Sequence, residues 1–188
     1  MADFQLSLNR TLAHEGGYSV VKADRGGETY RGVSRRFHPS WAGWIVVDQL
    51  KHEPGFPRNL QNHPGLQNQV GLFYHQQFWQ PLLGEQLVHQ AVADELFDTA
   101  VNMGIATAVS FAQTALNLLN RNQSSYPDGM VDGKMGPKTL KLLNDCSEPE
   151  ILVRTLNALQ AARYIRICEK DPSQEVFFRG WLKRTLPV

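Results

Sequence analysis

The sequence contains few of the residues that mark metal-dependent or disulfide-rich proteins. Its two cysteines, Cys146 and Cys168, belong to no CxxC pair, and its six histidines show no HExxH or other ligand spacing. A thiolate zinc site and a zinc hydrolase are therefore unsupported. The simplest interpretation of the cysteines is two buried thiols. A disulfide between them is the alternative if the protein is exported from the cytoplasm. No metal or organic cofactor is expected.

The sequence also lacks an excess of charge and any long apolar run. Nineteen Lys and Arg residues against eighteen Asp and Glu residues leave a net charge of +1, so nothing in the composition favours binding to nucleic acid. No apolar segment approaches the length of a membrane span. The first ten residues lack a charged segment followed by an apolar core, so no secretory signal peptide is expected.

The pattern that is present is helical. With 188 residues, of which 42% are hydrophobic, the chain can bury one sizeable core or two small subdomains. Apolar residues recur at spacings of three and four, which predicts amphipathic helices. The expected helices cover residues 3–14, 40–51, 64–80, 88–103, 106–120, 137–144, 147–168 and about 176–182. In the helix over 106–120 we expect Phe111, Ala115 and either Leu118 or Leu119 to be buried.

Glu15 stands where the opening helix ends. Asp3 is a plausible N-cap, and Gly16 and Gly17 stop the helix directly after Glu15. The carboxylate thus lies at the negative end of the helix dipole, where a cation would be more stable. A carboxyl group in such a field keeps its proton to higher pH, which suits a general acid.

A second acidic residue follows at a glycine turn. Asp24 comes nine residues after Glu15, and Thr29 begins a short β-prone segment five residues later. The turn lets the two carboxyl groups converge from opposite sides of a groove. One protonated and one ionised carboxyl group are the minimal apparatus for cleaving a glycosidic bond.

The order of the motifs resembles the glycoside hydrolase 108 family, N-acetylmuramidases of phage and bacterial origin. The likeness covers nearly the whole chain, and its second half is similar to the helical peptidoglycan-binding segment usually attached to these enzymes. One departure is Arg25, where the family commonly has proline. The motifs are His14-Glu15-Gly16-Gly17-Tyr18, Asp24-x-Gly26-Gly27-x-Thr29-x-x-Gly32, Phe97-Asp98-Thr99-Ala100-Val101-Asn102-Met103-Gly104, Asp132-Gly133-x-x-Gly136-Pro137-x-Thr139 and Gly180-Trp181-Leu182-x-Arg184.

The resemblance implies a mainly α, lysozyme-like α+β fold with a small β-hairpin region near the active site and a helical C-terminal half. By family convention, residues 1–93 form the catalytic region and residues 94–188 the peptidoglycan-binding region, packed together as one compact globule. The implied substrate is the β-1,4 bond between N-acetylmuramic acid and N-acetylglucosamine. Glu15 would be the general acid, while Asp24 and Thr29 would position the attacking water.

Four further residues are candidates for the substrate groove. Tyr18 and Tyr30 flank the proposed carboxyl groups and would offer ring faces to sugars, although ordinary partial burial explains them equally well. Asp98 and Asn102 lie one helical turn apart on one face. An asparagine near a glycine-stopped helix end is often only a C-cap, but the resemblance places Asn102, and more weakly Asp98, in the groove.

Two other patterns have simpler explanations. The segment from Asp128 to Gly133 suggests a calcium loop, but Met130 and Thr139 stand where that pattern requires oxygen ligands, so we expect a turn before a helix that begins at Pro137. The arginines at positions 31, 35 and 36 are expected to form a solvated face, and the alternative is a contact with peptide carboxylates of the wall.

Two rival functions remain open. A lytic transglycosylase needs only one glutamate and expels an internal hydroxyl group, and a non-catalytic wall-binding or secretion-assisting protein would need neither Asp24 nor Thr29. For the muramidase, the expected partner is the glycan strand of peptidoglycan and the expected state a monomer. Without a signal peptide, it would be made in the cytoplasm and reach the wall through a holin or a secretion machine, and an immunity protein is a further expected partner.

Overall fold

The computed structural model describes residues 1–13, 17–20 and 27–185. Glu15 and Asp24 therefore lie outside the described residues. The chain divides into two compact units, one formed by Phe4–Trp79 and the other by Met1–Asp3 with Gln80–Val188. The division into functional domains at residue 93 stays a prediction.

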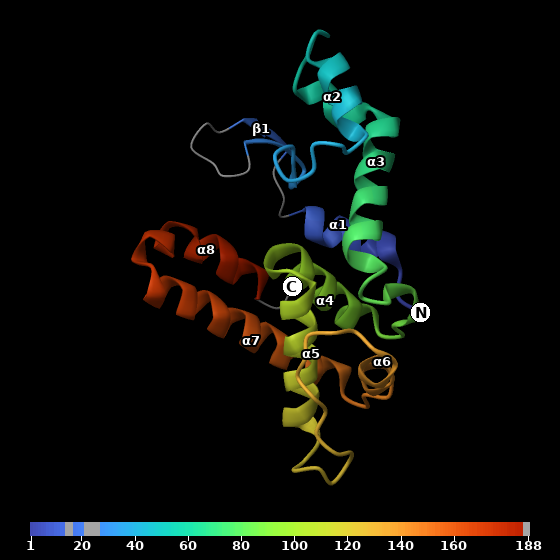
Figure 1. The fold of residues 1–188 in the computed structure, drawn as a ribbon, viewed down its shortest axis with the longest axis vertical. Coiled ribbons are helices and arrows are strands. Elements are labelled where there is room, and N and C mark those ends of the chain that lie inside the picture. Colours follow the sequence, from blue (N-terminus) through green and yellow to red (C-terminus); the bar gives the residue numbers. More distant parts are fainter. Residues whose placement is uncertain (14–16, 21–26, 186–188) are drawn as a thin grey trace. The chain divides into compact units, whose positions relative to one another are not determined.

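The prediction of a mainly α fold with a small β region is confirmed (Figure 1). The first unit contains α1 (Phe4–Leu12), β1 (Tyr18–Val20), β2 (Glu28–Tyr30), β3 (Val33–Ser34), α2 (Gly43–Leu50), η1 (Arg58–Asn62), α3 (Pro64–Tyr74) and the π-helical η2 (His75–Trp79). The second contains η3 (Gly84–Gln86), α4 (Gln90–Met103), α5 (Ile105–Leu119), α6 (Pro137–Asn144), α7 (Pro149–Lys170), η4 (Pro172–Gln174) and α8 (Glu175–Arg184).

In the first unit, one face of α3 contributes a row of buried side chains to the core. Leu66 and Val70 are almost completely buried, as their four-residue spacing predicts. His63 caps this helix, because its Nδ1 accepts a hydrogen bond from the backbone N–H of Leu66, and Pro64 occupies the first turn. Helix α2 packs against α3.

The three short strands form an antiparallel sheet in the order β1-β2-β3. Tyr18 pairs with Tyr30, and Thr29 pairs with both Ser19 and Ser34. Because side chains alternate between the two faces of a strand, this register separates the tyrosines from Thr29. One face carries the tyrosines, and the other carries three small hydroxyl side chains.

In the second unit, α4, α5 and α7 pack against one another, and α8 returns along α7 (Figure 1). The α7 residues that face this core are spaced four apart and are Leu152, Leu156, Gln160 and Tyr164. Cys146 and Cys168 are free thiols and half-buried, so the expectation of full burial is wrong for both.

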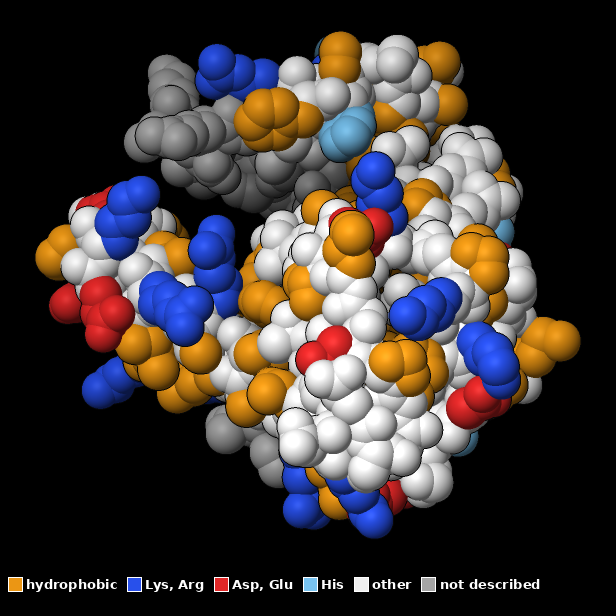
Figure 2. Space-filling view, turned by 60° about the horizontal axis from the view of Figure 1, so that its bottom comes forward, with side chains coloured by type: hydrophobic (Ala, Val, Ile, Leu, Met, Phe, Trp, Pro, Cys, Tyr) orange, Lys and Arg blue, Asp and Glu red, His pale blue; other side chains and the backbone are white. Residues whose placement is uncertain are grey.

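The surface carries mixed charge. On the face seen in Figure 2, Lys and Arg side chains are dispersed among uncharged groups, with Asp and Glu beside several of them. This arrangement agrees with the near-balanced charge of the sequence. Within the described ranges, no helix has both the length and the apolar character that crossing a bilayer requires.

Candidate functional site

Thr29 is the one predicted catalytic residue that the structure describes. It lies at the centre of β2, half-buried, with Ser19 and Ser34 beside it on neighbouring strands. Among the described residues, none forms a hydrogen bond with the Thr29 hydroxyl group. That group can therefore hold a water molecule, as its predicted role requires. Glu15 and Asp24 lie outside the described ranges, so their roles stay predictions.

Tyr30 lies in the core, not in a groove. Its exposed fraction is 0%, its hydroxyl donates to the backbone oxygen of Leu60 at 3.1 Å, and it accepts from Nε2 of Gln67 at 2.8 Å. A ring with no accessible face cannot stack on a sugar. The structure thus contradicts the substrate-binding role expected for Tyr30, since tyrosine packs well as an amphipathic core residue once its hydroxyl is satisfied.

Tyr18 is half-buried and already has partners. Its hydroxyl donates to Oε1 of Glu28 at 2.9 Å, and its ring lies edge-on to Phe56 at a centroid distance of 4.7 Å. Burial, followed by the nearby Glu28 carboxylate, raises the pKa of Tyr18. Tyr18 therefore supports the hairpin, and a contact with substrate stays a prediction.

Glu28 belongs to a network of four charged side chains that links β2 to α2. Arg35 donates to Oε2 of Glu28 at 2.9 Å and makes a two-pronged contact with the carboxylate of Asp48, with one N–O distance of 2.7 Å. Lys51 lies 2.6 Å from Glu28 and 2.9 Å from Asp48. Arg35 also lies over the ring of Trp44, at 5.1 Å from its centroid. The expectation that Arg35 is merely solvated is wrong.

The network lowers the pKa of both carboxyl groups. Burial alone would raise the pKa of Glu28, but hydrogen bonds from Lys51, Arg35 and Tyr18 outweigh it and hold that pKa below its ordinary value. Hydrogen bonds from Arg35 and Lys51 keep the pKa of Asp48 well below its usual range. Because Glu28 precedes Thr29 in β2, these contacts fix the strand that presents the Thr29 hydroxyl.

We expect the network to make stability depend on acidic pH. Glu28 and Asp48 hold protons less tightly when folded than when unfolded, so their stabilisation is complete above the unfolded pKa values of about 4 and is lost as pH falls below them. The midpoint of thermal unfolding should therefore fall between pH 6 and pH 3. The double variant Glu28→Gln/Asp48→Asn should show a shallower fall, measured by circular dichroism. The exposed Glu53→Gln should keep the parent slope, and an unchanged slope in the double variant would contradict the assignment.

Asp98 and Asn102 lie on α4, in the other compact unit. Arg184 of α8 donates to Oδ1 of Asp98 at 3.0 Å, and the side chains of this pair are only 11% and 13% exposed. Asn102 is exposed and donates to the backbone oxygen of Asp98 at 2.7 Å and to its Oδ2 at 3.1 Å. Asp98 thus joins two helices, and the exposed Asn102 is better placed to meet a ligand.

The Gly180–Arg184 motif attaches the last helix. Trp181 stacks on Tyr164 of α7, with ring centroids 5.2 Å apart and an interplanar angle of 21°. Burial, with the Asp98 carboxylate as a further cause, raises the pKa of Tyr164 to about 12. An aromatic stack and an ion pair therefore help to hold α8 against α7 and α4.

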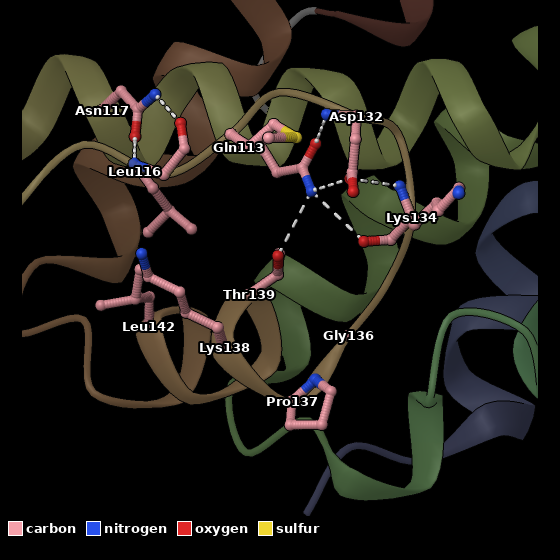
Figure 3. Close-up of a pocket in the computed structure, with 12 residues that line it drawn as sticks. Gln113, Leu116, Asn117, Asp132, Lys134, Gly136, Pro137, Lys138, Thr139 and Leu142 are labelled. Carbon is pink, nitrogen blue, oxygen red and sulfur yellow. Dashed lines mark hydrogen bonds between the residues drawn. The ribbon is translucent and has the colours of Figure 1, made fainter.

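The motif between Asp132 and Thr139 borders a pocket of about 290 Å³ between α5 and α6 (Figure 3). Gln113 is its structural centre. Its Nε2 lies 2.8 Å from Asp132 and 3.3 Å from Thr139, and its Oε1 accepts from the backbone N–H groups of Asp132 and Gly133. Gly133 has φ +69°, and a Cβ there would lie 2.8 Å from the backbone oxygen of Ala106. The motif therefore specifies a close-packed turn, and the predicted helix start at Pro137 is confirmed.

Comparisons with known proteins find a matching family for each half of the chain. The model of the family described as Glycosyl hydrolase 108 matches residues 8–104, and that of the Predicted Peptidoglycan domain matches residues 107–186. A solved structure of SagA from Brucella abortus is similar in fold, with a TM-score of 0.62 and 20% sequence identity over 97% of this chain and 88% of that one. A comparison with curated proteins finds no match.

Proposed function

The chain belongs to the glycosyl hydrolase 108 family, and on this premise we propose that it is an N-acetylmuramidase. Membership makes it a glycoside hydrolase, and the peptidoglycan domain that follows makes peptidoglycan the supported ligand. We assign the cut to the β-1,4 bond between N-acetylmuramic acid and N-acetylglucosamine. The observation that carries this proposal is the match over residues 8–104, which includes the Glu15, Asp24 and Thr29 motif.

The mechanism needs one proton donor and one positioned water molecule. Glu15 protonates the glycosidic oxygen while the sugar ring develops oxocarbenium character. Asp24 then deprotonates a water held by the Thr29 hydroxyl, and this water attacks the anomeric carbon from the opposite face. A separation of about 6.5–9.5 Å between the two carboxyl groups leaves room for the water and gives inversion at the anomeric centre. The Thr29 hydroxyl, which has no partner among the described residues, supports this role.

Product analysis tests the proposal directly. Purified peptidoglycan digested by the full chain should yield muropeptides with reducing N-acetylmuramic acid ends, detected by mass spectrometry. A lytic transglycosylase would instead form 1,6-anhydro ends, which are lighter by one water molecule. Binding to sacculi without release of reducing sugars would favour the non-catalytic alternative, so each result selects one of the three functions.

The Thr29 hydroxyl should contribute to turnover and not to folding. Thr29→Val keeps the branched shape that suits a strand but removes the hydroxyl, so kcat should fall by about tenfold, the effect of losing one hydrogen bond to the attacking water. Thr29→Ser keeps the hydroxyl and should retain most activity. The measurement is release of reducing ends under saturating substrate, with unfolding midpoints checked for both variants. Equal rates for the valine and serine variants would remove Thr29 from the mechanism.

A further inference from the structure

A second hollow of about 320 Å³ lies on the first compact unit, between the turn after β3 and one side of α3. Its lining includes aromatic and amide side chains, among them Trp41, Phe73, Gln69, Gln76 and Gln77. The volume is at the lower end of the range of about 300–1,000 Å³ found for ligand pockets. The hollow therefore suits a group of monosaccharide size.

The pocket side of α3 is distinct from its core side. Leu66, Val70 and Tyr74 form the buried stripe, spaced four apart. Gln69, Phe73 and Gln76 also lie at spacings of three and four, on a different side of the helix. The helix thus carries two rows of side chains, one that packs in the core and one that lines the hollow.

The π-helical segment η2 extends the pocket stripe. It spans His75–Trp79 and directly continues α3. Because a π-helix has more residues per turn than an α-helix, consecutive side chains diverge less, and both Gln76 and Gln77 line the hollow. Short π-helical segments inside helices frequently occur at functional sites.

The aromatic wall of the hollow is held firmly. The indole N–H of Trp41 donates to the backbone oxygen of Gln69 at 3.2 Å, and the ring meets Trp44 edge-on at a centroid distance of 5.2 Å. A Cβ at Gly43 would overlap the Trp41 ring, so that glycine allows the close contact. Phe73 lies 4.7 Å from His38 in an edge-on arrangement and completes the wall. A preformed wall lowers the entropy cost of binding.

Four polar side chains of the hollow have no hydrogen-bond partner within the described part of the chain. The side chains of Ser40, Gln69, Gln76 and Gln77 make no hydrogen bond there, in contrast to the pocket of Figure 3, where Gln113 joins the surrounding groups. Each free amide offers two donors and one acceptor, and the serine hydroxyl offers both. Among the described residues, no Asp, Glu, Lys or Arg side chain lines the hollow, and His38 is the one ionisable lining residue, so an ionic ligand would find no permanent counter-charge.

We propose that this hollow binds a neutral N-acetylated hexose unit of a glycan strand. Such a sugar presents hydroxyl and acetamido groups to the amides and an apolar face of C–H groups to the aromatic wall. The stem peptide of peptidoglycan carries carboxylates and fits a lining without Lys or Arg poorly. The choice of a glycan as ligand rests on the proposed function, but the hollow contains no residue of the Glu15, Asp24 and Thr29 motif and is a separate contact with the strand.

Nuclear magnetic resonance of the full chain tests the proposal with N,N′-diacetylchitobiose as the probe. The side-chain amide signals of Gln69, Gln76 and Gln77 and the indole signal of Trp41 should shift together on titration. The triple variant Gln69→Ala/Gln76→Ala/Gln77→Ala should raise the Kd by about tenfold or more, because several hydrogen bonds are lost at once. The matched control is Asn68→Ala, which removes an exposed side-chain amide of α3 outside the hollow and should bind like the parent.

Two results would overturn the proposal. One is the absence of shifts at these four residues up to the solubility limit of the sugar. The other is an equally strong response to the anionic dipeptide N-acetyl-L-alanyl-D-isoglutamine, which would mark a peptide site. Hydrolysis of peptidoglycan by the parent is followed separately through reducing ends. Shifts without hydrolysis would remove the muramidase function and leave the sugar site, while hydrolysis without shifts would remove the sugar site alone.

Discussion

Glu15→Gln should reduce the release of reducing ends from purified peptidoglycan by between about a hundredfold and ten-thousandfold, the range that a positioned general acid contributes. Glutamine has nearly the same shape and can still accept a hydrogen bond, but it cannot donate a proton to the departing sugar oxygen. The expected loss therefore falls on kcat, with the affinity for insoluble peptidoglycan largely kept. Turnover is measured at several enzyme concentrations, and binding by sedimentation with sacculi.

Glu53→Gln is the matched control for this substitution. It makes the same chemical change at an exposed position of the same compact unit and should leave turnover unchanged. Near-normal hydrolysis by Glu15→Gln would remove Glu15 as the proton donor. Equal losses in both variants would point to general destabilisation, which the unfolding midpoints would reveal.

Arg184→Met should lower the free energy of unfolding by about 3 kcal/mol or more, because it leaves a largely buried carboxylate without its cation. Methionine retains much of the apolar length of arginine, so little packing should be lost. The pair is mostly shielded from solvent, with exposed fractions of 11% and 13%, and the weak values typical of surface ion pairs do not apply. Urea unfolding followed by tryptophan fluorescence measures the change.

The double variant Asp98→Leu/Arg184→Met separates charge burial from packing. It removes both charges, so it should recover much of the stability that Arg184→Met loses. Asp98→Asn, measured with soluble muropeptides, tests the alternative role in substrate binding. A raised KM at unchanged stability would favour the groove. A double variant less stable than Arg184→Met would contradict the ion-pair assignment.

The helical part of the fold could be predicted because its signals are local. Val92, Leu96 and Ala100 are buried on α4 at the spacing that the sequence shows. The same reasoning succeeded only in part on α5, where Ala115 is buried as predicted. Phe111 and Leu119 are only half-buried there, and Leu118 is 66% exposed. That helix contacts α4, α6 and α7, and its buried residues are chiefly small, including Ala108, Ala112 and Ala115. A stripe drawn through the largest apolar residues misses a face built for close helix contact.

The candidate site was predicted less completely because it depends on pairs that are distant in sequence. The residues around Arg35 in the sequence do not predict its contact with Asp48. The three-residue spacing of Asp48 and Lys51 indicates only that α2 has a charged face. For Tyr30, the sequence did contain the information that predicts its separation from Thr29. It is adjacent to Thr29 in a β-prone segment, and adjacent residues of a strand point to opposite faces. Strand alternation alone would have separated the two.

The two faces of the small sheet could be redesigned independently of each other. Ser19, Thr29 and Ser34 occupy one of its faces, while Glu28 and its cationic partners are reached from the other. Tolerance to acid could therefore be adjusted by redesigning the ionic side without altering the hydroxyl-bearing side. A library restricted to Arg35, Asp48 and Lys51 would yield variants tuned to different acidities that share one hydroxyl-bearing surface.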